Sequence, residues 1–246
     1  MTIKKIHRLI SSINGAIGNR PFQSFSYNSL ELILSEHYKK WKFIPNNYYE
    51  FGTGEGNSLR LYLRALKKIL KVSDLNVNYF NVFLFDSFEG LPVYTDGKNK
   101  NPAWSKSQFL GSVDRIKGII QNELPAMLQN TQFIKGFYEN TLTRDLRISL
   151  EKYPPSIVNI DVDYFTSTHM ILEWIYSICQ EGSIFYFDDI FEYLGNQFKG
   201  EGKAIADFNK NHFSEGYHIF PFSNFGIPSY TGKVFTLNKF DTPVSE

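Results

Sequence analysis

A glycine-rich turn between a short apolar strand and an amphipathic helix constrains the fold of this chain most strongly. Aromatic residues of 48–51 are suited to a buried strand, residues 52–56 (GTGEG) interrupt it, and apolar residues then recur at helical spacing from 59 to 70. Glycine lets bare backbone approach a ligand, and the unpaired N–H groups at a helix start attract anions. The stretch therefore predicts a strand–turn–helix unit that binds a ligand.

Two nucleotide cofactors are bound by turns of this kind. The dinucleotide pattern G-x-G-x-x-G requires a third glycine at position 57, which is Asn57 here, so NAD(P) fits imperfectly. The pattern acidic-x-G-x-G-x-G, which runs here from Glu50 to Gly56, is typical of S-adenosylmethionine (SAM) methyltransferases. Glu50 is an acceptor rather than a phosphate ligand, which favours a cofactor with a cationic or hydroxyl-rich end. A tight turn without a ligand is a third alternative.

The composition fits one α/β domain with a sizeable core, because 42% of the 246 residues are hydrophobic and 17% are aromatic. A net charge of +1 gives no indication of a nucleic-acid partner. Cys179 is the one cysteine and lies in an apolar helical pattern, so we expect a buried, inert thiol. No apolar run reaches the roughly 18 residues of a membrane span, and no signal peptide is apparent. We therefore expect a cytoplasmic protein.

The first 44 residues are expected to form a helical extension, and residues 45–246 to form the α/β domain. Amphipathic helices are predicted at 3–18 and 28–42. They could pack on their own domain, cover a site, or pair with a second copy of the chain in a homo-oligomer.

Strands and helices alternate after the glycine turn. The polar stretch 90–111 is too long for a simple turn and is predicted to be a loop over a site. This alternation predicts one doubly wound, Rossmann-like α/β domain with about seven mostly parallel strands, closed by an antiparallel pair. The predicted strands lie at 78–86, 131–136, 155–163, 182–189, 217–222 and 233–238, and the predicted helices near 112–122, 143–151, 167–180 and 202–212.

Acidic residues stand at the carboxyl ends of four predicted parallel strands, where ligands of open α/β sheets bind. Turn formation explains any single acid, but four successive acidic ends predict a site that holds cations. Asp86 is placed to accept the hydroxyls of a nucleoside ribose. Three others could form an incomplete oxygen shell around Mg²⁺, and without the metal at least one of their pKa values should rise. The acids are Glu50, Asp86, Asp161, Asp163, Asp188 and Asp189, and the proposed metal ligands are Asp161, Asp188 and Asp189.

Four motifs in order resemble one family, the macrocin O-methyltransferases, which are SAM- and Mg²⁺-dependent methyltransferases of macrolide sugars. They are FDSFEGLP (85–92), FIKGFYENTL (133–142), IDVDYFTS (160–167) and FDDIFEY (187–193). The similarity extends from about Tyr49 to Phe208, and the three proposed metal ligands occupy the family's metal positions. The tyrosine of the family's D-x-D-x-Y-x-S motif is Phe165 here, and Tyr164 stands one place earlier.

The resemblance implies a class I methyltransferase fold and in-line transfer of a methyl group from SAM to a hydroxyl of a sugar or sugar-containing metabolite. Asp161 and Asp163 are candidate bases, whereas His169 is more typical of a packed or capping histidine. Phe137 could stack on adenine or belong to the core. Alternatives are methylation of a non-sugar oxygen or nitrogen of a small polar metabolite, or a non-catalytic SAM-fold protein that binds a partner. The expected cofactor contacts are Glu50, Gly52, Thr53, Gly54, Gly56, Asn57, Ser58, Asp86, Ser87, Gly136 and Phe137.

Overall fold

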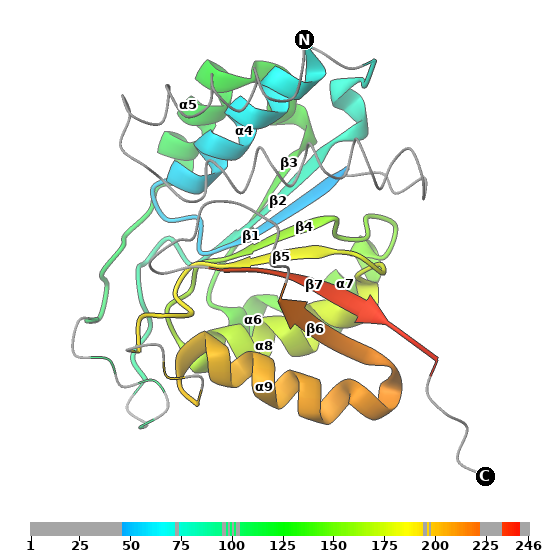
Figure 1. Cartoon of the computed structure of the whole chain (residues 1–246). Coiled ribbons are helices and arrows are strands. Elements are labelled where there is room, and N and C mark those ends of the chain that lie inside the picture. The colour runs from blue at the N-terminus through cyan, green and yellow to red at the C-terminus, as the bar shows by residue number, and fades with distance from the viewer. Residues whose placement is uncertain are drawn as a thin grey trace, which may run out of the picture.

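The computed structural model describes residues 46–71, 74–94, 97, 99, 101, 104–193, 196, 198–221 and 233–241. The helices expected at 3–18 and 28–42 lie outside these residues. The helical extension and any homo-oligomer formed through it therefore stay predictions. Element labels follow Figure 1, in which the first described helix is α4.

Strands and helices alternate as the hydrophobic pattern predicts. The strands are β1 (Asn47–Phe51), β2 (Asn81–Asp86), β3 (Thr131–Lys135), β4 (Ile157–Ile160), β5 (Ile184–Phe187), β6 (Tyr217–Pro221) and β7 (Lys233–Lys239). The α-helices are α4 (Asn57–Leu70), α5 (Val113–Glu123), α6 (Tyr138–Thr141), α7 (Arg144–Leu150), α8 (Phe165–Ile175) and α9 (Gly200–His212). Short 3-10 turns are η2 (Val77–Tyr79), η3 (Pro125–Asn130), η4 (Tyr176–Ile178) and η5 (Phe213–Glu215).

The seven described strands form one sheet in the order β3-β2-β1-β4-β5-β7-β6. Strands β1 to β5 pair in parallel, and β7 runs antiparallel to both β5 and β6. The predicted doubly wound α/β sheet with a closing antiparallel pair is therefore confirmed. Because the order reverses between β1 and β4, the carboxyl ends of these strands border the switch point at which ligands of such sheets bind.

Helices cover both faces of the sheet, with α4 and α5 on one side and α6, α8 and α9 on the other (Figure 1). Successive strand residues point to opposite faces, so neighbours in β1 belong to different cores. Tyr48 packs with Leu59 and Ile116 of the α4–α5 layer, whereas Tyr49 packs with residues of the α8–α9 layer such as Ile171. Burial on both faces explains why the strands are almost continuously apolar.

Two further expectations concern single features of the chain. Cys179 is buried, and burial raises the pKa of its thiol to about 12, as expected of an inert cysteine. No helix within the described ranges is both long and apolar enough to cross a membrane.

Candidate active site

Backbone hydrogen bonds beyond the ends of the strands hold the carboxyl edge of the sheet together. The Gly52 N–H donates to the Phe85 carbonyl at 2.9 Å, and the Asp161 N–H donates to the Phe51 carbonyl at 3.0 Å. The Asp188 N–H continues the same pattern by donating to the Ile160 carbonyl at 3.0 Å. The glycine turn, Asp161 and Asp188 are thus fixed along one edge.

A cavity of about 820 Å³ opens at this edge, and most of the predicted site residues line it. Its volume is in the upper part of the usual range for small-molecule sites. The turns after β1, β2 and β3 line one half of the edge, and those after β4 and β5 line the other. The predicted residues in the lining are Gly52, Thr53, Gly54, Asn57, Ser58, Asp86, Ser87, Gly136, Phe137, Asp161, Asp163, Asp188 and Asp189.

Glu50 differs from its prediction, because it does not line the cavity. The side chain is fully buried in β1, where it accepts hydrogen bonds from Tyr48 Oη (3.2 Å) and Asn159 Nδ2 (3.4 Å). Burial raises the pKa of Glu50 to about 8, although these hydrogen bonds oppose the shift. The structure gives this carboxyl group partners within the protein rather than access to a cofactor.

Gly56 is also absent from the lining. It precedes α4 with a left-handed backbone (φ 76°), and a Cβ atom there would lie 2.9 Å from Ile119 Cδ1 of α5. No side chain caps α4 at this position. Gly56 therefore turns the chain into the helix and packs against α5.

The glycine turn reaches the cavity through Gly52, Thr53 and Gly54. Gly52 has φ +82°, and a Cβ atom there would lie 1.8 Å from the Asp161 carbonyl oxygen, so its bare backbone allows the turn to meet β4. The Gly54 N–H donates to Asp86 Oδ2 at 2.7 Å, which ties the turn to the end of β2. Thr53 Oγ1 is buried and has no hydrogen-bond partner among the described residues. Such an atom fits a bound polar ligand, since buried polar groups are normally satisfied.

Asp86 combines cavity exposure with a structural role. Its two carboxylate oxygens accept the N–H groups of Gly54 (2.7 Å) and Phe88 (2.6 Å). Burial raises the pKa of Asp86, while these backbone hydrogen bonds oppose the shift. Each carboxylate oxygen has a second lone pair, so Asp86 can still accept hydroxyls at the cavity wall.

Asp161, Asp188 and Asp189 converge as the sequence predicts, and we call them the carboxylate trio. One oxygen from each lies within 4.8 Å of the others. Oxygens that share Ca²⁺ at 2.3–2.6 Å are at most about 5 Å apart, and oxygens that share Mg²⁺ at about 2.1 Å are at most about 4.2 Å apart. The trio, an all-oxygen donor set within 4.8 Å, therefore has approximately the spacing of a site for a hard cation. None of the ion pairs found among the described residues includes a member of the trio.

Burial and mutual repulsion raise the pKa of Asp161 and of Asp189 well above the ordinary aspartate value. Burial also raises the pKa of Asp188, against the effect of a hydrogen bond from Tyr186 Oη (2.7 Å). The expected rise in pKa without a metal is thus confirmed. In this arrangement the carboxylates favour either protons or a cation.

Asp163 lines the cavity beside the trio. It has a left-handed backbone (φ 64°), which is uncommon for a residue other than glycine, and its N–H donates to Asp189 Oδ2 at 3.1 Å. Burial and the charges of Asp188 and Glu192 raise the pKa of Asp163 to about 7. A group with this pKa can exchange a proton near neutral pH.

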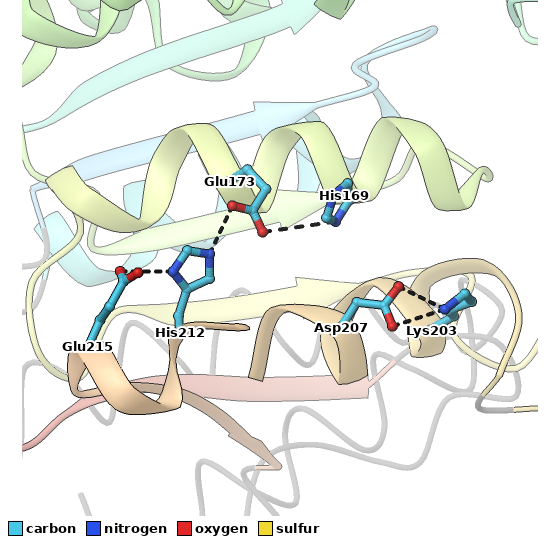
Figure 2. Close-up of polar contacts among 6 residues, drawn as sticks. All are labelled: His169, Glu173, Lys203, Asp207, His212 and Glu215. Carbon is cyan, nitrogen blue, oxygen red and sulfur yellow. Dashed lines mark hydrogen bonds and ion pairs between the residues drawn. The ribbon is translucent and has the colours of Figure 1, made fainter. Parts of the chain in front are cut away.

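His169 lies away from the cavity, on α8, as its prediction as a packed histidine implies. Its ring stacks on Phe165 with centroids 5.5 Å apart, and Nδ1 is 4.0 Å from Glu173 Oε1 (Figure 2). The cavity lining does not include it, so the candidate bases stay Asp161 and Asp163.

Sequence reasoning located the loop over the site but not the individual residues in it. Described residues of 90–111 that line the cavity include Tyr94 and Trp104. Each ring packs edge-on against the ring of Tyr164, with ring centroids 5.3 Å apart. Tyr138 and Glu192 also line the cavity. Their places within two of the motifs, GFYENTL and FDDIFEY, were the available signal.

Comparison with known proteins identifies the family. A sequence profile described as macrocin-O-methyltransferase (TylF) matches residues 41–214, which is well over half of the chain. The chain belongs to this family. It is therefore a SAM-dependent O-methyltransferase, and this agrees with the glycine turn and the acidic strand ends. No curated protein matched the sequence.

Several solved methyltransferase structures have a fold similar to that of this chain. The calicheamicin methyltransferase CalS11 superposes with a TM-score of 0.59 at 19% identity, covering 85% of this chain and 83% of its own. The O-methyltransferase NovP superposes with a TM-score of 0.58 at 16% identity, and the match covers 88% of this chain and 79% of NovP. A third structure is the O-methyltransferase TomG from Streptomyces achromogenes, which is involved in tomaymycin synthesis and was solved in complex with SAM. It superposes with a TM-score of 0.52 at 12% identity, and the match covers 89% of this chain and 79% of TomG. At these identities the likeness concerns the fold.

Proposed function

We propose that this O-methyltransferase methylates a hydroxyl of a sugar or sugar-containing metabolite, with a divalent cation held by the carboxylate trio. The observation that carries the proposal is that the trio and the glycine turn line one cavity. A methyl donor at the glycine turn and an acceptor at the trio would lie next to each other. Proximity of this kind supplies a large part of the rate of a two-substrate reaction.

The donor half of the cavity suits SAM. Asp86 offers acceptors for the ribose hydroxyls, and Gly136 and Phe137 offer a surface for adenine. Thr53 Oγ1 would gain a partner from the bound cofactor, and the uncapped N–H groups at the start of α4 attract its carboxylate.

The acceptor half suits a sugar. Trp104 and Tyr94 present aromatic surface in the same cavity as the trio and Asp163. A sugar ring has apolar C–H faces and hydroxyl edges, so it can use both kinds of lining. A hard divalent cation such as Mg²⁺, when bound, would supply a Lewis acid that orients adjacent acceptor oxygens and lowers the pKa of the hydroxyl.

The proton of the acceptor hydroxyl needs a base. We assign this role to Asp163, because Asp161 belongs to the trio, whereas Asp163 lines the same cavity and its backbone N–H donates to Asp189 of the trio. SAM, when bound, would supply the methyl group, and its carbon–sulfur bond would break with the electrons passing to sulfur as the acceptor oxygen bonds to the methyl carbon. The proton passes to Asp163, and the products are the methyl ether and S-adenosylhomocysteine (SAH).

Methyl transfer from radiolabelled SAM to nucleotide sugars, free sugars, phenols and amines tests the proposal. Metal-free protein should transfer methyl groups poorly, and added Mg²⁺ should restore transfer to sugar hydroxyls by at least tenfold. Transfer that is insensitive to chelation would contradict the role of the trio. Transfer to phenols or amines but to no sugar would contradict the acceptor.

A further inference from the structure

Glu201 is a fully buried acid beside the active site that sequence reasoning did not single out. It lies in the first turn of α9, with 0% of its surface exposed, and it does not line the cavity. Its Oε2 accepts the backbone N–H of Asp189 at 2.9 Å. An acid twelve residues away in sequence thus contacts the peptide group of a predicted metal ligand.

The burial of Glu201 is costly. Its Oε1 is buried and has no hydrogen-bond partner among the described residues, whereas buried polar atoms are normally paired. Three other carboxyl groups, the carboxylate trio, lie close enough to repel it. A residue that only filled space here would be better apolar, because a buried carboxyl with one unpaired oxygen destabilises a fold.

The contact has a defined place in the site. Asp189 lies beyond the last residue of β5, where the sheet no longer holds its N–H. Glu201 accepts that N–H, and the Asp189 side chain in turn accepts the N–H of Asp163 at 3.1 Å. A line of hydrogen bonds therefore runs from α9 through a member of the trio to the candidate base.

We propose that Glu201 is a positioning residue that fixes Asp189 in the orientation required to bind the divalent cation. This inference rests on the proposed metal site. Partners that orient the ligands of a metal typically contribute 10–100-fold to its affinity. The length of the Glu201 side chain, which brings an oxygen to the Asp189 N–H, is the property that matters.

Mn²⁺ titration followed by electron paramagnetic resonance tests the inference, because free Mn²⁺ is measured directly and no turnover is needed. Three variants of the whole chain separate reach from charge. Glu201→Gln keeps an oxygen at the same reach, Glu201→Asp keeps the charge on a shorter side chain, and Glu201→Ala removes both. We expect Glu201→Ala and Glu201→Asp to bind Mn²⁺ 10–100-fold more weakly than the parent. Glu201→Gln should bind at least five times more tightly than either.

SAH affinity, measured by calorimetry, serves as the control for folding and should stay within about threefold of the parent in each variant. If Glu201→Ala does not fold, the comparison of Glu201→Asp with Glu201→Gln carries the test. Parent-like Mn²⁺ affinity in Glu201→Asp, or equal weakening in the Asp and Gln variants, would overturn the inference. A parent protein that binds no Mn²⁺ would instead overturn the proposed metal site.

Discussion

Carboxylates gather in two regions of this molecule, and the two regions differ in whether basic side chains pair with them. At the carboxyl edge of the sheet, the carboxylate trio and Asp163 form none of the ion pairs found in the described part of the chain. Along and between α8 and α9, each acid drawn in Figure 2 faces a basic side chain of the protein. The two regions lie on neighbouring elements, so the difference is local.

The α8–α9 region shows how a protein stabilises its own acids. His212 lies between Glu173 Oε2, 2.8 Å from Nε2, and Glu215 Oε2, 2.9 Å from Nδ1. Lys203 donates to both oxygens of Asp207 one turn along α9, at 2.9 and 2.8 Å (Figure 2). These contacts connect α8, α9 and η5 without any outside ion.

Within the described residues, the cavity acids form no such ion pairs, and they repel one another. Unpaired buried carboxylates lower the free energy of unfolding, so their presence indicates a function that requires them. We infer that the ion-paired acids serve stability, whereas the acids that line the cavity serve ligand binding. The predictions below test that division.

The largest expected effect comes from Asp188→Asn. The variant removes one charge of the trio, so turnover should fall at least 100-fold while SAH affinity, measured by calorimetry, stays within about threefold. Relief of repulsion should raise the melting temperature of the metal-free protein by about 2–4 °C, the shift that corresponds to about 1 kcal/mol. Full turnover, or a loss of SAH binding equal to the loss of turnover, would contradict the proposed role of the trio in binding a cation.

A smaller effect is expected for the cofactor half of the cavity. Asp86→Ala should weaken SAH binding by about 1–3 kcal/mol, since a charged hydrogen-bond acceptor is lost. Glu50→Gln should weaken it by clearly less, because Glu50 does not line the cavity. Calorimetric titration of SAH into both variants measures the difference. Equal losses would mean that Glu50 reaches the cofactor after all.

The smallest effect is expected for the ion-paired α8–α9 region and depends on pH. Burial lowers the pKa of His212, but hydrogen bonds to Glu215 and Glu173 outweigh burial, so the pKa is raised. A histidine with a raised folded pKa stabilises the fold fully below its unfolded pKa of about 6.5, and this contribution is lost as pH rises through the folded pKa. Urea unfolding should therefore show His212→Gln less stable than the parent by about 1 kcal/mol at pH 6, with a smaller difference at pH 8.5.

Asp207→Asn is the matched control in the same region. It breaks one partly exposed ion pair without a histidine, so it should cost about 0.3–0.5 kcal/mol at either pH. A pH-dependent loss in this variant would point to a general charge effect rather than to His212. The other titratable groups near His212 are Glu173, Glu215, His169 and Tyr176.

Much of the fold and of the candidate site could be predicted from local patterns. The apolar runs of β2, β4 and β5 and the period of α8 are visible in the sequence, because burial on both faces leaves few polar positions. Acids directly after parallel strands had to lie at one edge of the sheet, so the sequence predicted that the three trio residues would lie close together. Trp104 and Tyr94 were not predicted as site residues, because the conformation of a loop depends on what it packs against.

The sequence by itself determined the order of strands and helices, the glycine turn and the acidic edge, since each follows from spacing along one segment. Only the tertiary structure decided which acids are paired. Glu50 is buried with Tyr48 on β1 and meets Asn159 of β4, and Glu201 meets Asp189 because α9 begins beside the end of β5. Such contacts join residues from separate elements, and their distances arise from packing. Local periodicity carries no information about them.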